Sequence, residues 1–502
     1  MNKKCKTWML LCCASMLLAS CASGEDAGVE VGSHDAVQTT GDGTMVTETA
    51  AATRLEPDLP DSDFGGYAFR VYSKGDDHPH WVAKDIIAEE ENGDPINDAV
   101  FRRNSVICER YNFKMEEIRE NNWVANINRA VGAGEDAYDL LMLHPNSVIN
   151  VLAENQMLTD LHDVPYMDLQ APWYDRNANE SLSIGGALYA TVGEISIMDN
   201  DATWVVLFNK EMAEEFDVEN LYDLVKSGKW TLDRLYQLSE DVSGDINGDG
   251  LLDEFDRWGV QNEPYNVMAF CQAAGEKIVD KDKDDLPYVT LGSDRFISVF
   301  TRAMDLLTDQ SVCMNYQDYT AKYGGTDPWT ECMDPAFADG RVLFNVTGLN
   351  RVTMFRSMDA DFGILPMPKF EETMESYISP VQMWCSSSIA VLKSASDLER
   401  TGIIVEALSA ESMYTLTPAY YDVTLKTKLS RDEESAEMLD LIFADRVYDI
   451  GAMYNWGNVY QLTLDLASAK NYNFQSAYAK NEKAIDVKIR KSIEAIVAGQ
   501  ET

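Results

Sequence analysis

Basic residues and histidine are scarce in this sequence. Its 502 residues include 41 lysines and arginines against 84 aspartates and glutamates, which gives a formal net charge of −43, and only five are histidines. Nucleic acids are bound through a positively charged surface, and anionic lipid headgroups repel a chain of this charge. The composition therefore argues against a nucleic-acid partner and against a membrane contact that depends on surface charge.

Catalytic signatures are also absent. The sequence has no H-E-x-x-H, G-x-S-x-G, P-loop or G-x-G-x-x-G motif. His78 and His80 lie close to Asp76 and Asp77, but this group is more typical of a solvated loop than of a metal site. We therefore expect a protein that is not an enzyme, although the many acidic residues leave open a carboxylate pair for glycoside hydrolysis.

Long apolar runs occur only at the front of the chain. Three lysines precede the apolar residues 8–18, and Leu18-Ala19-Ser20-Cys21 follows. This pattern is typical of a secretory signal, and its last four residues resemble the lipobox of bacterial lipoproteins. The resemblance implies a signal peptide over residues 1–20, a lipid on Cys21 and a location at the extracellular face of the bacterial cell membrane.

The segment behind the leader has few large apolar residues. Residues 21–61 are mostly small, hydroxyl-bearing or acidic. Such a segment cannot bury enough surface to order itself. We expect a lipidated, disordered tether that leads to a folded body beginning near residue 62.

A disulfide framework is not indicated, despite nine cysteines. Three lie in the leader and Cys21 is the predicted anchor, while the other five are widely spaced and form no C-x-x-C pair. We expect mostly buried free thiols, and a bridge between Cys313 and Cys332 stays open.

Strand and helix patterns alternate through the body, which favours an α/β fold with parallel strands. Helices are expected from Lys210, after the cap Thr231, and over residues 97–110 and 296–310. The last two carry apolar stripes, formed by Ala99, Val100, Val106 and Ile107 in one and running from Phe296 to Leu307 in the other, and a last helix carries Ile485, Ile489 and Ile493 on one face. The expected strands are residues 67–72, 111–118, 138–143, 187–192, 204–208, 342–344, 362–366 and 389–392.

Residues 245–256 match the pattern of a calcium-binding loop. Such loops supply oxygen ligands from positions 1, 3, 5, 7, 9 and 12, with glycine at position 6. The last position carries aspartate instead of the usual glutamate, which lowers the expected affinity. We predict a structural Ca²⁺ site, with a solvated acidic turn as the alternative; its ligands would be Asp245, Asn247, Asp249, the Leu251 carbonyl, Asp253 and Asp256.

Tryptophan is frequent in the body, often beside polar or turn residues. Sugars are bound by stacking an apolar ring face on an aromatic plane while polar groups hold the hydroxyls. A core position explains any single tryptophan better, but the set suggests a carbohydrate ligand. The nine are Trp81, Trp123, Trp173, Trp204, Trp230, Trp258, Trp329, Trp384 and Trp456.

Three stretches of the body, residues 185–210, 337–344 and 362–368, follow one another in a recognisable order. Together with the lipobox they resemble the extracellular solute-binding lipoproteins of ABC import systems, of the sugar-type family 1. The resemblance implies an α/β, two-lobed periplasmic-binding-protein-like fold of type II, whose lobes are joined by a hinge and close on a ligand. The implied lobes are residues 62–190 with 380–428, and residues 191–379; residues 429–502 would add C-terminal helices that pack on them.

The same resemblance nominates ligand contacts after the strand ends, with two tryptophans as stacking platforms. Members that bind maltose-like sugars often carry a tryptophan shortly after the 337–344 stretch, where this chain reads Val346-Thr347-Gly348-Leu349. This argues against a starch-type oligosaccharide and leaves other sugars open. The nominated residues are Lys74, Asp76, His144, Asn146, Glu194, Asp199, Asn345, Asn350, Trp384 and Trp456.

We therefore expect a monomeric, membrane-anchored protein that captures a mono- or oligosaccharide and delivers it to an ABC permease. Two alternatives stay open. One is a surface glycoside hydrolase lipoprotein, and the other is a binding protein for a peptide or another non-sugar solute.

Overall fold

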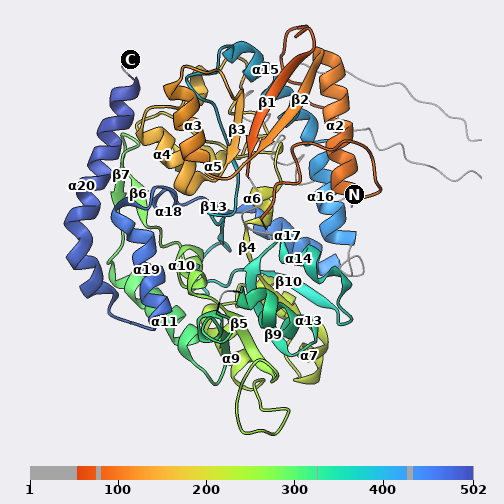
Figure 1. Cartoon of the computed structure of the whole chain (residues 1–502). Coiled ribbons are helices and arrows are strands. Elements are labelled where there is room, and N and C mark those ends of the chain that lie inside the picture. Colours follow the sequence, from red (N-terminus) through yellow and green to blue (C-terminus); the bar gives the residue numbers. More distant parts are fainter. Residues whose placement is uncertain (1–53, 75–80, 325, 427–432, 501–502) are drawn as a thin grey trace, which may run out of the picture. The chain divides into compact units, whose positions relative to one another are not determined.

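The computed structural model describes residues 54–74, 81–324, 326–426 and 433–500 (Figure 1). Residues Pro57–Thr502 form one unit by their contacts, and the description below concerns this unit. The predicted signal peptide, Cys21, most of the predicted tether and Asp76 lie outside the described residues.

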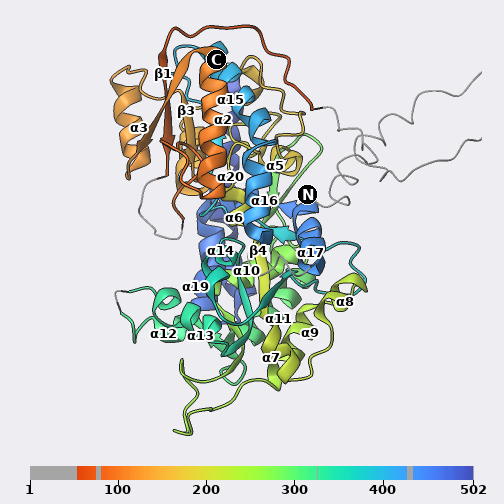
Figure 2. The same cartoon turned by 90° about the vertical axis from the view of Figure 1, so that its right-hand side faces the viewer.

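The first sheet has four strands in the order β12-β3-β1-β2. Strand β1 pairs in parallel with β2 and with β3, whereas β12 is antiparallel to β3. Helix α3 (Trp123–Gly132) covers one face, and α2 (Pro95–Tyr111) and α15 (Leu398–Ser412) lie on the other (Figure 2). The strands are β1 (Tyr67–Ser73), β2 (Phe113–Arg119), β3 (Leu140–Leu143) and β12 (Ser388–Ala390).

Local sequence explains the ends of α2. The Asp94 carboxylate accepts the backbone N–H groups of Ile96 and Asn97, and Pro95 occupies the first helical position, where no donor is needed. The helix ends at Asn112, which has a positive φ of 50°. Of the apolar stripe expected here, Ala99, Val100 and Ile107 are buried, whereas Val106 is exposed.

The second sheet has five strands in the order β10-β4-β9-β5-β8. Strand β5 is parallel to β9 and β8, and β4 is antiparallel to both of its neighbours, β9 and β10. Every residue of these strands is buried, because helices and loops cover both faces. They are β4 (Trp204–Asn209), β5 (Trp258–Asn262), β8 (Cys313–Asn315), β9 (Val342–Gly348) and β10 (Phe362–Pro366).

The expected parallel pairing is confirmed for β1, β2 and β3 but not for β4 or β12. Each of these two is the first strand that the chain adds after passing from one sheet to the other. The right-handed crossover rule concerns the connection between parallel strands of one sheet, so it does not apply to a strand that arrives from the other sheet. A segment that arrives from the other sheet is free to pair in either direction.

Several helices agree with the sequence pattern. Helix α11 (Asp294–Thr308) buries the expected stripe from Phe296 to Leu307, and α9 (Leu232–Glu240) begins at Thr231, whose hydroxyl accepts the Arg234 N–H at 3.2 Å. The expected strand over residues 187–192 is wrong, since this segment makes only isolated bridges. Further helices are α7 (Lys210–Glu215), α8 (Leu221–Lys226), α10 (Pro264–Ala273), α12 (Tyr316–Tyr319), α13 (Asp334–Ala338), α14 (Arg351–Met354), α16 (Leu416–Lys426) and α17 (Glu433–Ala444).

The C-terminal segment contacts both halves of the unit. Helix α20 (Phe474–Gln500) packs on α4 (Asn150–Glu154), near the first sheet, and on β7 (Pro287–Val289), which lies in the part that carries the second sheet. It runs along one side of the unit in Figure 1, beside α19 (Val459–Ser468). The lobe boundaries stay a prediction.

None of the described helices has both the length and the apolar composition needed to span a bilayer.

A buried arginine ties together the segments that run between the sheets. Arg446, in β13 (Arg446–Val447), places Nη2 2.5 Å from Asp175 Oδ2 and Nη1 2.8 Å from Asp199 Oδ2. Its strand pairs in parallel with β11 (Ser379–Pro380). The Tyr448 hydroxyl also donates to Asp175, at 3.0 Å. The segments around residues 175, 199, 379 and 446 are therefore held at one point.

Replacing Arg446 with leucine is expected to lower the free energy of unfolding by about 3–5 kcal/mol, because two buried carboxylates lose their counter-charge. Urea unfolding followed by circular dichroism measures this. Arg102→Leu is the matched control, since its ion pair with Glu91 is exposed and is expected to contribute less than about 1 kcal/mol. Equal effects of the two substitutions would contradict the assigned role of Arg446.

Candidate functional site

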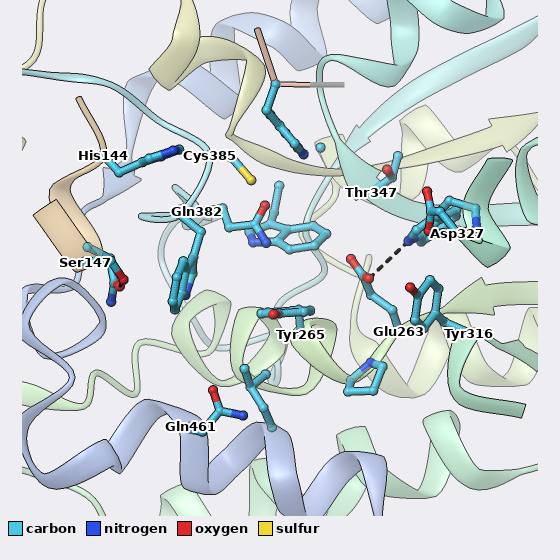
Figure 3. Close-up of a pocket in the computed structure, with 18 of the residues that line it drawn as sticks. His144, Ser147, Glu263, Tyr265, Tyr316, Asp327, Thr347, Gln382, Cys385 and Gln461 are labelled. Carbon is cyan, nitrogen blue, oxygen red and sulfur yellow. Dashed lines mark hydrogen bonds between the residues drawn. The ribbon is translucent and has the colours of Figure 1, made fainter. Parts of the chain in front are cut away.

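A cavity of about 490 Å³ lies between the two sheets and is lined from both (Figure 3). Lys74 follows β1 and His144 follows β3 in the first sheet, while Glu263 follows β5 and Tyr316 follows β8 in the second. These are the carboxyl ends of the parallel strands, where ligands bind in open α/β sheets. The connection that carries Gln382 and Trp384, and helix α19, complete the lining.

Aromatic rings dominate the wall. Five of the nine tryptophans of the body line the cavity, together with Tyr265 and Tyr316. Such faces suit the apolar faces of sugar rings. The five are Trp81, Trp123, Trp204, Trp329 and Trp384.

A glycine on β9 makes room for one of these rings. A Cβ at Gly348 would lie 3.2 Å from Trp81 Cη2 and 2.9 Å from Asn350 Oδ1. A side chain there would require Asn350 to shift and would crowd the Trp81 indole. No tryptophan occurs in the stretch Val346-Thr347-Gly348-Leu349. Instead, Trp81 from the first half of the chain packs against Gly348 and lines the cavity there.

The end of the cavity near the first sheet carries a neutral imidazole beside a cation. Burial and the nearby Lys74 ammonium lower the pKa of His144 to about 3. Its ring meets the Trp123 indole edge to face, with the ring centroids 5.2 Å apart. At neutral pH His144 is therefore uncharged.

The end near the second sheet is acidic. The Trp329 indole N–H donates to Glu263 Oε2 at 3.1 Å, and Arg351 Nη1 lies 2.5 Å from Asp334 Oδ2. Burial, reinforced by the charges of Asp327 and Asp334, raises the pKa of Glu263 to about 7, although Trp329 and Arg351 act in the opposite direction. In Figure 3 the Glu263 carboxylate points into the cavity, and Asp327 lies on the same side.

Four of the nominated residues meet in the cavity: Lys74, His144, Asn146 and Trp384. Asn146 belongs to a kinked turn after β3, and its amide donates to the Ala452 carbonyl at 2.5 Å. Asp76 lies outside the described residues.

Five other nominated residues do not line the cavity. Glu194 accepts a hydrogen bond from Thr417, and Asp199 belongs to the Arg446 network. Asn345 is buried in the middle of β9, and Asn350 lies behind Gly348. Trp456 stacks on Tyr454 and donates to Ser492 of α20 at 2.7 Å, so its position gives no support to a role as a stacking platform.

Sequence reasoning missed the residues that the second sheet contributes. Glu263 follows β5, a strand that was not expected. Asp327 lies in a loop, and Trp329 is the first residue of a short π-helix (Trp329–Met333) that was not expected either. The only available signal was the number of tryptophans in the body, which indicated the kind of site without locating it.

The calcium-like loop has carboxylates that accept its own backbone N–H groups. Asp245 accepts from Gly248 at 2.6 Å and from Gly250 at 2.9 Å, and the buried Asp256 accepts from Ile246 at 3.0 Å. Among the described residues, no group of three or more acidic, histidine or cysteine side chains is placed to hold a metal ion. The fit is therefore incomplete, and the Ca²⁺ site stays a prediction.

The disulfide that was left open does not form. Cys313 and Cys332 are both free thiols.

No family model matches the sequence, and no curated protein matches it. Solved structures do resemble it. An ABC substrate-binding protein from Listeria monocytogenes in complex with cycloalternan has a TM-score of 0.54 at 13% identity, covering 85% of this chain and 99% of the other.

Two further structures are similar. The maltose/maltodextrin-binding domain MalE from Bdellovibrio bacteriovorus, bound to maltotriose, has a TM-score of 0.53 at 14% identity and covers 84% of this chain and 100% of the other. The GacH receptor of Streptomyces glaucescens, solved unliganded and with acarbose, has a TM-score of 0.50 at 14% identity, with 86% and 98% covered. At these identities the similarity concerns the fold, and it confirms the expected two-lobed α/β fold of solute-binding proteins.

If the 245–256 loop binds Ca²⁺, a chelator is expected to lower the melting temperature, because an ion that binds only the folded chain stabilises it. Differential scanning fluorimetry with and without EDTA measures this, and Asp249→Ala should abolish the difference. Asp284→Ala, in another exposed acidic turn, is the control that should leave it unchanged. No response of the parent protein to EDTA would contradict the prediction.

Proposed function

We propose that this chain is a non-catalytic, membrane-anchored extracellular substrate-binding protein, which captures a carbohydrate between its two sheets and delivers it to an ABC permease. The observation that carries the proposal is the cavity, which is lined by aromatic faces and by polar groups from both sheets. Two of the similar proteins were solved with a sugar bound: the substrate-binding protein from Listeria monocytogenes with cycloalternan, and the MalE domain from Bdellovibrio bacteriovorus with maltotriose. This supports the same class of ligand here.

The lining suits a hydroxyl-rich ligand of moderate size. Aromatic planes accept the apolar faces of the sugar rings, while amide, carboxylate and hydroxyl groups such as Gln382, Gln461, Glu263 and Thr347 exchange hydrogen bonds with hydroxyls. The volume falls in the range of about 300–1,000 Å³ typical of small-molecule sites.

Residues of both sheets line the cavity, and this favours closure about a hinge when a ligand binds. A ligand that contacts Lys74 and His144 on one side and Glu263 and Trp329 on the other links the two halves, and it binds best where both contact it together. The ligand therefore favours a closed arrangement.

The tether suits delivery. If the predicted tether over residues 21–61 behaves as a flexible coil, its forty or so residues would span roughly 35 Å root-mean-square. A loaded protein on such a tether stays within reach of a permease in the same membrane.

A sugar that binds is expected to raise the melting temperature, since a ligand at 100 times its dissociation constant adds about 2.7 kcal/mol. Fluorimetry across mono- and oligosaccharides, peptides and amines identifies the ligand class. Small-angle scattering should then show a smaller radius of gyration with the same sugar. Stabilisation by peptides alone, or turnover of a glycoside, would contradict the proposal.

Trp384→Ala is expected to weaken binding of that sugar at least about tenfold, or about 1.4 kcal/mol, because a stacking face is lost from the cavity wall. Isothermal titration calorimetry measures the change. Trp384→Phe should retain part of the affinity, and Tyr166→Ala, at an exposed aromatic residue outside the cavity, should retain all of it.

Replacing Cys21 with serine is expected to remove the lipid and release the protein from the membrane. Fractionation of cells that express either form, followed by immunoblotting, tests this. A Cys108→Ser variant, changed in the body, controls for the loss of a thiol. Membrane retention of the Cys21→Ser protein would contradict the anchor.

A further inference from the structure

The acidic end of the cavity carries more negative than positive charge. Glu263 and Asp327 line it, and Asp334 lies behind them. Among the described residues whose charges act most strongly on Glu263, Arg351 is the only cation, and its Nη1 is engaged by Asp334. Three carboxyl groups thus lie near one guanidinium, and burial raises the pKa of Glu263 to about 7 and that of Asp334 to about 6.

Glu263 is positioned to contact a ligand. Its backbone is fixed at the start of α10, where its N–H donates to Asn266 Oδ1 at 2.7 Å. One carboxylate oxygen is held by Trp329, which leaves the group turned toward the cavity (Figure 3). The side chain is therefore already ordered, and it loses little conformational entropy when a ligand binds.

The surroundings favour a cation more than a neutral group. Tyr265 and Tyr316 line the cavity beside the carboxylate, and the faces of such rings attract cations. Trp329, which donates to the carboxylate, already has the Arg351 guanidinium over its ring, 5.1 Å from the ring centroid. A sugar hydroxyl would donate one hydrogen bond to Glu263 but leave the surplus charge uncompensated. A protonated amine would supply both the hydrogen bond and the missing positive charge.

We propose that this end of the cavity binds the protonated amine of an amino sugar, with Glu263 as the residue that contacts it. The inference rests on the proposed carbohydrate-binding function and narrows its ligand class. Under this proposal, Glu263 at the end of β5 determines the preference for an amine-bearing sugar over a neutral one. The tryptophans stack on the rings of both kinds of sugar.

The test compares matched sugars by isothermal titration calorimetry at pH 7. The pairs are glucosamine with glucose, galactosamine with galactose, and the β-1,4-linked glucosamine disaccharide with cellobiose. N-acetylglucosamine controls for the bulk of the substituent without its charge. At least one amine is expected to bind tenfold or more tightly than its neutral counterpart.

Glu263→Gln, which keeps a hydrogen-bonding group but removes the charge, is expected to reduce this preference below threefold, measured as the ratio of the two affinities in the same variant. Glu263→Asp should retain part of the preference. An unchanged melting temperature of the free variants would show that they fold. A preference that survives Glu263→Gln overturns the inference.

The pH dependence gives a second readout. Glu263 is charged above its pKa of about 7 and neutral below it, so lowering the pH from 7 to 5.5 should weaken amine binding roughly tenfold. Binding of N-acetylglucosamine should stay unchanged, and Glu263→Gln should lose the dependence. The titratable and charged groups that face Glu263 are Arg351, Asp327, Asp334, Tyr265, Tyr316 and Tyr460.

The outcomes separate this inference from the proposed function. If neutral sugars bind as tightly as their amines, the amine site is overturned and carbohydrate capture stands. If no sugar of either kind binds, both are overturned.

Discussion

The buried guanidinium of Arg446 is the contact on which the arrangement of the two sheets depends. It joins Asp175, Asp199 and the β11–β13 pair, so the segments that run between the sheets meet at one charged centre. The desolvation cost of these groups is offset only while they stay together. Tyr448 adds hydrogen bonds to the same carboxylates. This centre fixes the connecting segments relative to one another. The ligand-binding residues come from the two sheets on either side of it.

Burial sets the charge of the cavity at both ends. Desolvation makes His144 neutral despite a usual pKa near neutrality, and it brings Glu263 to the middle of the physiological range. One end therefore presents the ammonium of Lys74 and the other presents carboxylates. Aromatic rings line the wall between the two ends.

Position relative to strand ends explains which nominated residues reach the cavity. Lys74 and His144 directly follow parallel strands of the first sheet, and both line it. Glu194 and Asp199 follow an expected strand that does not exist, and they are placed in the connection between the sheets instead. Trp456 has the right residue type, but it packs against α20. Residue type alone did not distinguish a cavity wall from a helix interface.

The sequence by itself determined the α/β class, the strands β1 to β3 with helix α2, the amphipathic helix α11 and an aromatic-rich body, because these depend on local periodicity, caps and composition. Only the tertiary structure decided that five tryptophans far apart in the chain face one cavity, that β4 and β12 run antiparallel to their neighbours, and that Glu263 joins Trp329 and Asp327. The antiparallel pairings arise where the chain passes from one sheet to the other, whereas the cavity brings together segments that are distant in the sequence. Both depend on contacts between distant residues, which no local pattern encodes.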